Sequence, residues 1–208
     1  MHKKLGICCI VLGVVCLLGA VGFVVYNRWE EQNAEQFSQT LLQDVQTQME
    51  AIKPAPELPV APPTQNFPEE EPEITPKEMA TIPVDGYSCL GILSIPVLEV
   101  ELPVLTDWSY TKLKKAPCHY YGSYYEGDFV IAAHNYKSHF GRLSELQPGD
   151  IVLFTDAQGV QHSYRVVLLE TLPKEATLEM ITSGFDLSLY TCTPGGASRV
   201  TVRCNRIQ

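Results

Sequence analysis

Two reactive side chains stand at the ends of a short turn near the C-terminus. The turn runs from Cys192 to Arg199 through Thr-Pro-Gly-Gly-Ala-Ser and separates two strand-like segments. A thiol becomes a nucleophile when its thiolate is stabilised or a base removes its proton, and arginine supplies a permanent positive charge. Because side chains alternate along a strand, Cys192 shares a polar face with Ser188 and Tyr190, and Arg199 joins that surface if the strands pair. We therefore predict a cysteine nucleophile beside a fixed cation.

The base for this nucleophile is expected among the histidines, which exchange protons near neutral pH. His134 follows the apolar strand Phe129 to Ala133, where its side chain would emerge from a rigid scaffold. His119, His139 and His162 stand in polar loop or strand contexts, as expected of solvated or hydrogen-bonded residues. Position alone leaves His134 open between a catalytic role and a structural hydrogen-bonding role.

Disulfide bonds or a metal would compete for the same residues. Beyond the N-terminal apolar run the chain keeps four cysteines without a C-x-x-C element: Cys89, Cys118, Cys192 and Cys204. We expect Cys192 to be free and Cys204, on the apolar face of its strand, to be a core residue. A zinc site could draw on Cys118, His119, His134 and His139, but their spacing matches no compact zinc motif. We expect neither a metal nor a cofactor.

An N-terminal membrane anchor is predicted from the uncharged run of 22 residues from Leu5 to Tyr26. A cleaved signal peptide would show a shorter apolar core and a small-residue cleavage site, and neither is found. Lys3 and Lys4 precede the run, while 11 acidic residues lie between it and position 80. This bias places residues 1–4 in the cytoplasm and the remainder outside the cell. The formal charge of −9 and the lack of a basic patch argue against nucleic-acid binding.

The segment after the anchor divides into a helix and a stalk. Residues 27–53 form the predicted juxtamembrane helix, because apolar residues recur at intervals of three and four: Ala34, Phe37, Leu41, Val45, Met49 and Ile52. This stripe could pack on the domain, pair with another copy or lie near the membrane, and we expect a helix that spaces the domain. Residues 54–80 form the predicted stalk, since eight of the 23 residues from Pro54 to Pro76 are proline.

Residues 81–208 are predicted to form one mainly β domain. Short apolar runs separated by turn residues predict strands at residues 89–95, 97–105, 129–133, 151–155, 163–170, 186–192 and 199–205. The sequence Asp-Ala-Gln-Gly at 156–159 predicts a hairpin turn. Helical segments are few, at about 110–115 and 141–146. So many short strands indicate a closed or nearly closed barrel.

Four segments of this domain stand out: Leu90 to Pro96 with residues 102–104, Val130 to Asn135, Ser188 to Pro194 and Arg199 to Arg203. In this order they resemble the sortase family of cysteine transpeptidases from Gram-positive cell surfaces. Ser188 to Pro194 resembles the Thr-Leu-x-Thr-Cys signature, with serine where threonine is usual, and Arg199 to Arg203 resembles the Arg-Leu-x-Val strand. Val130 to Asn135 is similar to the segment that carries the family histidine, with Ala133 in place of a common glycine. Leu90 to Pro96, with Leu-Pro-Val at 102–104, is similar to the strands that open the domain.

The resemblance implies a closed eight-stranded β-barrel with short helices and a membrane-anchored transpeptidase. Cys192 would cleave a Leu-Pro-x-Thr-Gly-like sorting signal after threonine and form a thioacyl intermediate. His134 would protonate the departing amine and deprotonate the incoming one, and Arg199 would stabilise the oxyanion. Arg203 follows the pattern of a second arginine in some sortases. Calcium modulates some sortases, which leaves the loop carboxylates of Glu126 and Asp128 open as ligands.

The acceptor amine is left open by the sequence. It would come from a peptidoglycan precursor or from a pilin lysine, and a thiol hydrolase would use water instead. Pilin-polymerising sortases usually carry an Asp-Pro-aromatic lid and a second, C-terminal span. Asp107-Trp108 lacks the proline, and the chain ends at Gln208 soon after the last strand. We therefore expect a cell-wall acceptor, with the sortase class unresolved. A papain-like hydrolase would have the reverse order of cysteine and histidine, and a non-catalytic surface module would not need Cys192.

Overall fold

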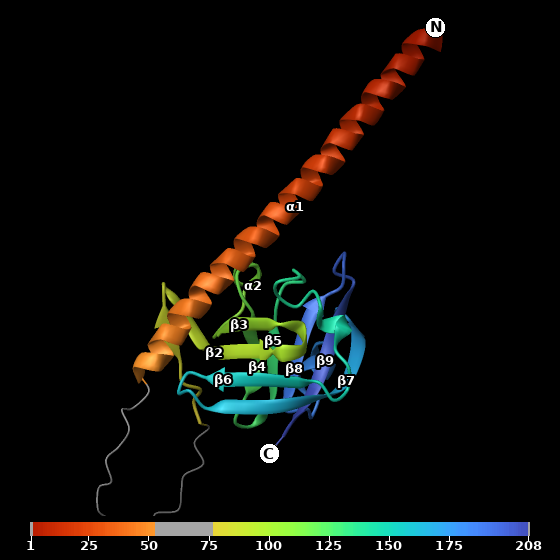
Figure 1. The fold of residues 1–208 in the computed structure, drawn as a ribbon. Helices are drawn as coiled ribbons and strands as arrows, with labels where there is room; N and C mark the ends of the chain where they lie inside the picture. Colours follow the sequence, from red (N-terminus) through yellow and green to blue (C-terminus); the bar gives the residue numbers. More distant parts are fainter. Residues whose placement is uncertain (1, 53–76, 208) are drawn as a thin grey trace, which may run out of the picture.

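One long helix and a closed β-sheet make up this computed structural model, which describes residues 2–52 and 77–207 (Figure 1). Helix α1 (His2–Ile52) is unbroken and contains both the apolar run 5–26 and the predicted juxtamembrane helix. Within the described residues it is the one helix long and apolar enough to cross a membrane. Most of the predicted stalk, residues 54–80, lies outside the described part of the chain.

Nine strands form a single sheet within residues 77–207. They are β1 (Ile82–Val84), β2 (Tyr87–Ile95), β3 (Val100–Leu105), β4 (Cys118–Ser123), β5 (Gly127–Ala132), β6 (Ile151–Asp156), β7 (Gln161–Pro173), β8 (Leu187–Cys192) and β9 (Ser198–Arg206). Their order is β1-β2-β3-β4-β5-β8-β9-β7-β6, and β6 also pairs with β2. This last pairing closes strands β2 to β9 into a ring, and β1 pairs with β2. The predicted mainly β, barrel-like fold is confirmed.

Three elements were not expected from the sequence: β1, β4 and helix α3 (Thr177–Ile181). The predicted strand 97–105 is also too long, because residues Pro96–Leu98 form a 3-10 turn, η1, and Glu99 is left-handed with φ 54°. Strand β3 therefore begins at Val100. The two predicted helical segments appear as α2 (Tyr110–Leu113) and the 3-10 turn η2 (Leu143–Glu145).

The barrel interior is filled by alternating apolar side chains of the strands. Phe129, Ile131, Phe154 and Leu189 are fully buried there. Cys204 is buried with them, as predicted, and burial raises the pKa of its thiol to about 12. It is therefore a core residue and a poor nucleophile.

Closure of the ring depends on a glycine at the β2–β6 junction. Gly91 pairs with Asp156 and has φ +150°. A Cβ atom at this position would lie 2.0 Å from the carbonyl oxygen of Thr155. Glycine allows the two backbones to approach where a side chain would separate them.

The second half of α1 packs on the outside of the barrel and does not simply space the domain. Leu41 and Val45 are buried against a cluster that includes Ile82 and Leu105. The expected spacer is therefore wrong, and of the alternatives the described structure supports packing on the domain. The apolar stripe is the cause, because it gains more by covering strands β1 to β3 than by facing water.

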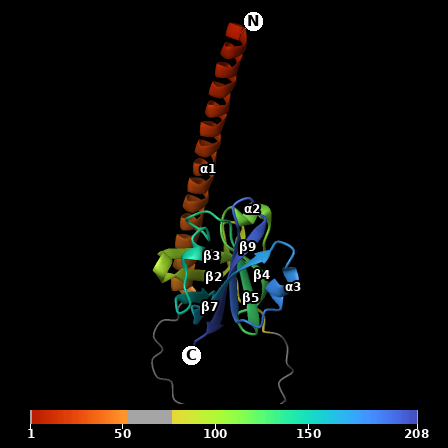
Figure 2. The same ribbon diagram turned by 90° about the vertical axis from the view of Figure 1, so that its right-hand side faces the viewer.

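The barrel end that carries α2 points toward the N-terminal half of α1. That half extends beyond the barrel in both views, and the C-terminus of the chain lies at the opposite end of the barrel (Figures 1 and 2). Large apolar side chains of this half are exposed, including Leu17, Phe23 and Tyr26. The fold thus gives the barrel a distinct end that faces the apolar part of the helix.

Candidate active site

Strands β8 and β9 place the predicted nucleophile and cation opposite each other. Cys192 and Arg199 are directly paired residues of the antiparallel ladder. Such pairs bring side chains onto the same face at adjacent positions. Cys192 is exposed and its thiol is free. The expected proximity of the thiol and the guanidinium follows from the hairpin register.

The turn between them is held by its own backbone. Thr193 N–H donates to the carbonyl of Ser198 at 3.0 Å, and Gly196 N–H donates to that of Thr193 at 2.8 Å. Gly195 and Gly196 have φ values of 83° and 74°, in the region that favours glycine. Arg199 Nη1 donates to the carbonyls of Gly196 and Ser198, each at 3.1 Å. The turn therefore restrains the guanidinium beside the thiol.

His134 reaches the same place through a parallel ladder between β5 and β8. Ala132 pairs with Tyr190, and Ala133 N–H donates to the Tyr190 carbonyl at 3.2 Å. Thr191 Oγ1 donates to the Ala133 carbonyl at 2.9 Å, which extends the contact between the two segments beyond the ladder. Two residues beyond the Ala132–Tyr190 pair stand His134 and Cys192. The register therefore places His134 and Cys192 at the same level of two neighbouring segments.

The surroundings of His134 favour its neutral form. Burial lowers the pKa of the half-buried imidazole, nearby Lys114 lowers it further, and Glu30 of α1 opposes the change. The ring stacks on Tyr136, with centroids 4.0 Å apart and an angle of 23°. Nδ1 is buried and has no hydrogen-bond partner among the described residues. Stacking therefore orients the ring, while the neutral imidazole can accept a proton.

A groove of about 160 Å³ leads to Cys192 along the outer face of the barrel. Its lining includes Trp108, Tyr120, Ala176, Met180, Tyr190 and Arg199. Tyr190 and Tyr120 meet edge to face, with ring centroids 5.5 Å apart. A second hollow, about 210 Å³, shares only Cys192 with the groove and is lined in part by Asn135, Ser144 and Thr193. The thiol thus stands between an aromatic groove and a more polar hollow.

Arg203, the second arginine of β9, does not line the groove but supports α3, which does. Its side chain is 2% exposed and donates from Nε to Glu170 Oε1 and from Nη1 to Ser188 Oγ, both at 2.8 Å. Nη2 donates to the carbonyl of Glu179 in α3, also at 2.8 Å. Ser188, expected on a polar face, is consequently buried beneath this network. Arg203 therefore ties α3 to the barrel, whereas Arg199 faces Cys192.

The remaining histidines differ from one another. His119 contacts the carbonyls of Thr106 and Gly122 at 3.2 and 2.9 Å, and His162 Nε2 lies 2.9 Å from Asp156 Oδ2. Both match the expected hydrogen-bonded role. His139 contradicts it, because it is 1% exposed and neither ring nitrogen has a partner among the described residues. Burial lowers its pKa to about 4. The compact loop after His134 folds it inward.

Sequence reasoning named Cys192, His134 and Arg199 as candidates but missed the groove. Tyr120 lies on the unpredicted strand β4, and Met180 lies on the unpredicted helix α3. The density of aromatic residues around Trp108 and Tyr120 is the signal that could have indicated a binding surface.

The family is settled by the sequence comparison, since the family model for the sortase domain matches residues 93–207. The chain belongs to the sortase family. Sortase D of Bacillus subtilis (strain 168) is 29% identical over 123 residues, which cover 57% of this chain and 61% of that relative. The chain thus matches less than two thirds of that protein's length.

Solved sortases share the fold. Sortase C1 of Streptococcus agalactiae is 25% identical with a TM-score of 0.54, over 61% of this chain and 71% of that one. Sortase C1 of Streptococcus suis is 28% identical with a TM-score of 0.51, over 58% of this chain and 73% of that one. The Sortase D5 transpeptidase of Clostridium perfringens is 18% identical with a TM-score of 0.51, over 58% of this chain and 79% of that one, and supports the fold alone. Membership of this family supports a transpeptidase-type function.

Proposed function

We propose that this sortase cleaves a Leu-Pro-x-Thr-Gly-like sorting signal after threonine and transfers the protein to an amine acceptor. The observation that carries the proposal is the double register of β8. Its ladder with β9 pairs Cys192 with Arg199, and its ladder with β5 leads to His134. A nucleophile, a proton carrier and a fixed cation are the groups that acyl transfer needs.

In the first half of the reaction, Cys192 Sγ attacks the threonine carbonyl carbon and a C–S bond forms. The oxygen gains negative charge, and the Arg199 guanidinium stabilises it. The carbon–nitrogen bond to glycine then breaks, and the proton that the thiol gave to His134 passes to the departing amine. The products of this half-reaction are the thioacyl enzyme and the free amine.

In the second half, the acceptor amine attacks the thioacyl carbon. His134 removes a proton from the amine, the C–S bond breaks and the thiolate takes the proton back. The new amide joins the acceptor to threonine, and the enzyme regains its starting state. The hollow lined by Asn135, Ser144 and Thr193 is our candidate entry for the acceptor, because it reaches Cys192 and shares no other lining residue with the groove.

We propose a cell-wall precursor as the acceptor, because pilin-polymerising sortases usually carry an Asp-Pro-aromatic lid and Asp107-Trp108 lacks the proline. A pilin lysine is the alternative, supported by the likeness, at 27% identity, to sortase C2 of the group B Streptococcus pilus island 1. We further propose that residues 5–26 anchor the chain in the cell membrane with the barrel outside the cell. The exposed apolar side chains of this part of α1 support that arrangement.

The test uses the full chain in detergent micelles with sorting-signal peptides and two acceptors, a glycine peptide and a lysine peptide. Mass spectrometry should detect a thioacyl adduct and a ligated product in the wild type, and neither in Cys192→Ala. Cys89→Ala is the matched control, because burial raises the pKa of the Cys89 thiol to about 11 and keeps it unreactive. An adduct that survives in Cys192→Ala would refute the proposal, and hydrolysis without ligation would favour water as the acceptor.

A further inference from the structure

The helix that leaves the apolar run contacts the catalytic end of the barrel almost at once. Lys114 Nζ lies 2.5 Å from Glu30 Oε1, and the backbone N–H of Lys137 donates to Glu31 Oε1 at 2.7 Å. The uncharged run ends at Tyr26. At a helical rise of about 1.5 Å per residue, Glu30 lies roughly 6 Å further along α1. The barrel therefore meets the helix within a short step of the apolar segment.

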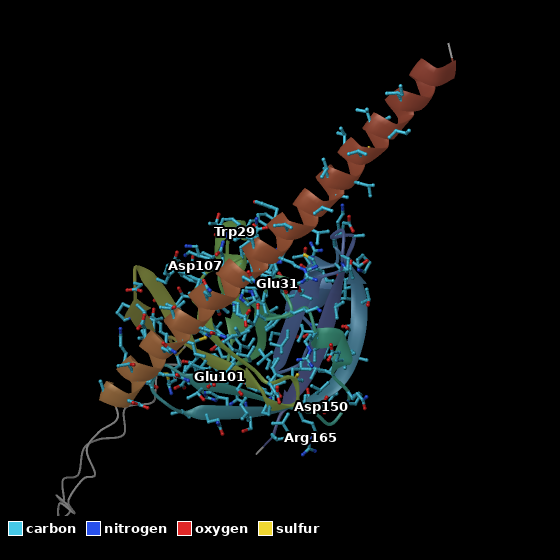
Figure 3. The ribbon with its side chains drawn as sticks, turned by 45° about the horizontal axis from the view of Figure 1, so that its top comes forward. Trp29, Glu31, Glu101, Asp107, Asp150 and Arg165 are labelled. Atoms are coloured by element: carbon cyan, nitrogen blue, oxygen red, sulfur yellow. The ribbon has the colours of Figure 1, made fainter. Side chains whose placement is uncertain are left out.

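Both contacts belong to the end of the barrel where Cys192 lies. Lys114 directly follows α2, and Lys137 lies three residues after His134. Trp29 and Glu31 of the helix gather near Asp107 at this end, while Asp150 and Arg165 lie at the other end (Figure 3). Since α1 is docked along the barrel through Leu41 and Val45, this orientation is fixed by packing rather than by a loose connection.

Three exposed aromatic side chains lie at the same end. Trp29 is 59% exposed, Trp108 is 43% exposed and Tyr110 is 79% exposed. Trp108 and Tyr110 meet edge to face, with centroids 5.8 Å apart. Tryptophan and tyrosine are favoured at membrane–water interfaces, where the ring contacts apolar groups and the polar atom contacts water. One headgroup layer is about 5–7 Å thick, which is comparable to the step from Tyr26 to Glu30.

We infer that the Trp108–Tyr110 rim is a membrane-contacting surface and that the partner it fits is the lipid headgroup layer around α1. The inference rests on the proposed anchoring by residues 5–26. The docked helix fixes the orientation of the barrel, so that the opening of the groove faces the bilayer from which α1 emerges. Cys192 then opens at the level of the headgroups, where membrane-held substrates would present their reactive groups.

The chain has two tryptophans, which allows a direct test. Trp29→Phe leaves Trp108 as the single reporter, and Trp108→Phe leaves Trp29. Each full-length variant is reconstituted into phosphatidylcholine vesicles with or without nitroxide-labelled headgroups. The expected result is fluorescence quenching of both reporters by the labelled lipid. As the matched control, Arg165→Trp in a chain lacking both natural tryptophans places a reporter at the far end, where we expect the same fluorescence in both vesicles.

The outcomes separate the inference from the anchoring on which it rests. If Trp29 is quenched while Trp108 fluoresces equally in both vesicles, the anchor is correct and the membrane-contacting rim is refuted. If Trp29 is not quenched either, the anchoring is refuted together with the rim. Quenching of the Arg165→Trp reporter to the same extent as Trp108 would also overturn the inference, because the barrel would then have no preferred end toward the bilayer.

Discussion

Replacing Arg203 by methionine should destabilise the barrel and loosen the groove wall. Methionine keeps the apolar stem but removes the donors to Glu170, Ser188 and the carbonyl of Glu179. Breaking a buried ion pair by removing one partner costs about 3–5 kcal/mol. The Glu170 side chain is 31% exposed and can regain water, so we expect a loss of about 2–3 kcal/mol in the free energy of unfolding.

The assay is thermal and urea unfolding of the full chain in detergent, with the exposed Arg165→Met variant as control. We expect the melting temperature of Arg203→Met to fall by roughly 5–10 °C, and that of the control to change little. Because α3 lines the groove through Thr177 and Met180, KM for the sorting peptide should rise more than kcat falls. Equal stability of the two variants, or a loss confined to kcat, would refute the role assigned to Arg203.

Three further substitutions probe other parts of the molecule. His139→Leu should flatten the pH dependence of stability. Burial lowers the pKa of His139 to about 4, so the unfolded chain binds more protons than the folded chain between pH 6.5 and 4. The stability of the wild type should therefore fall by roughly 2–3 kcal/mol as the pH drops through this window. Urea unfolding at both ends of the window checks this, and equal slopes for the two proteins would contradict it. Leu41→Asp should undock α1 at a cost of about 3 kcal/mol or more, and residues 34–50 should then be cleaved faster by a protease. The control Gln43→Asp changes an exposed residue and should behave as wild type. Equal cleavage of the two variants would rule out docking through this stripe. Gly91→Ala should cost about 2–4 kcal/mol because its Cβ would meet the Thr155 carbonyl, and an unchanged urea midpoint would show that β2 and β6 can separate freely.

Local sequence patterns predicted the elements whose signal lies within a few residues. The alternation in β8 and β9 and the Thr-Pro-Gly-Gly turn predicted a hairpin with Cys192 opposite Arg199, and the ladder has this pairing. The helical stripe from Ala34 onward was also visible in the sequence. Both follow from side-chain periodicity, which depends only on the local chain.

Features that depend on residues far apart in the chain could not be predicted from the sequence. Strand β4 carries adjacent tyrosines at 120 and 121 and Gly122, so it lacks clean alternation and is defined by its neighbours β3 and β5. Helix α3 has five residues and no side-chain cap, and Arg203 of a remote strand holds it through backbone carbonyls. The proximity of His134 and Cys192 needs the parallel β5–β8 ladder, so it came from the family resemblance and not from spacing.

Docking of α1 also bears on which recombinant fragments of this chain will stay monomeric. A fragment starting at residue 77 would retain all nine strands but uncover the apolar cluster that contains Ile82, Val84 and Leu105. Contiguous apolar patches of this kind promote self-association in water. A fragment starting near Glu30 would keep Leu41 and Val45 over the cluster and leave out the apolar run. The shorter barrel fragment is thus the more aggregation-prone of the two.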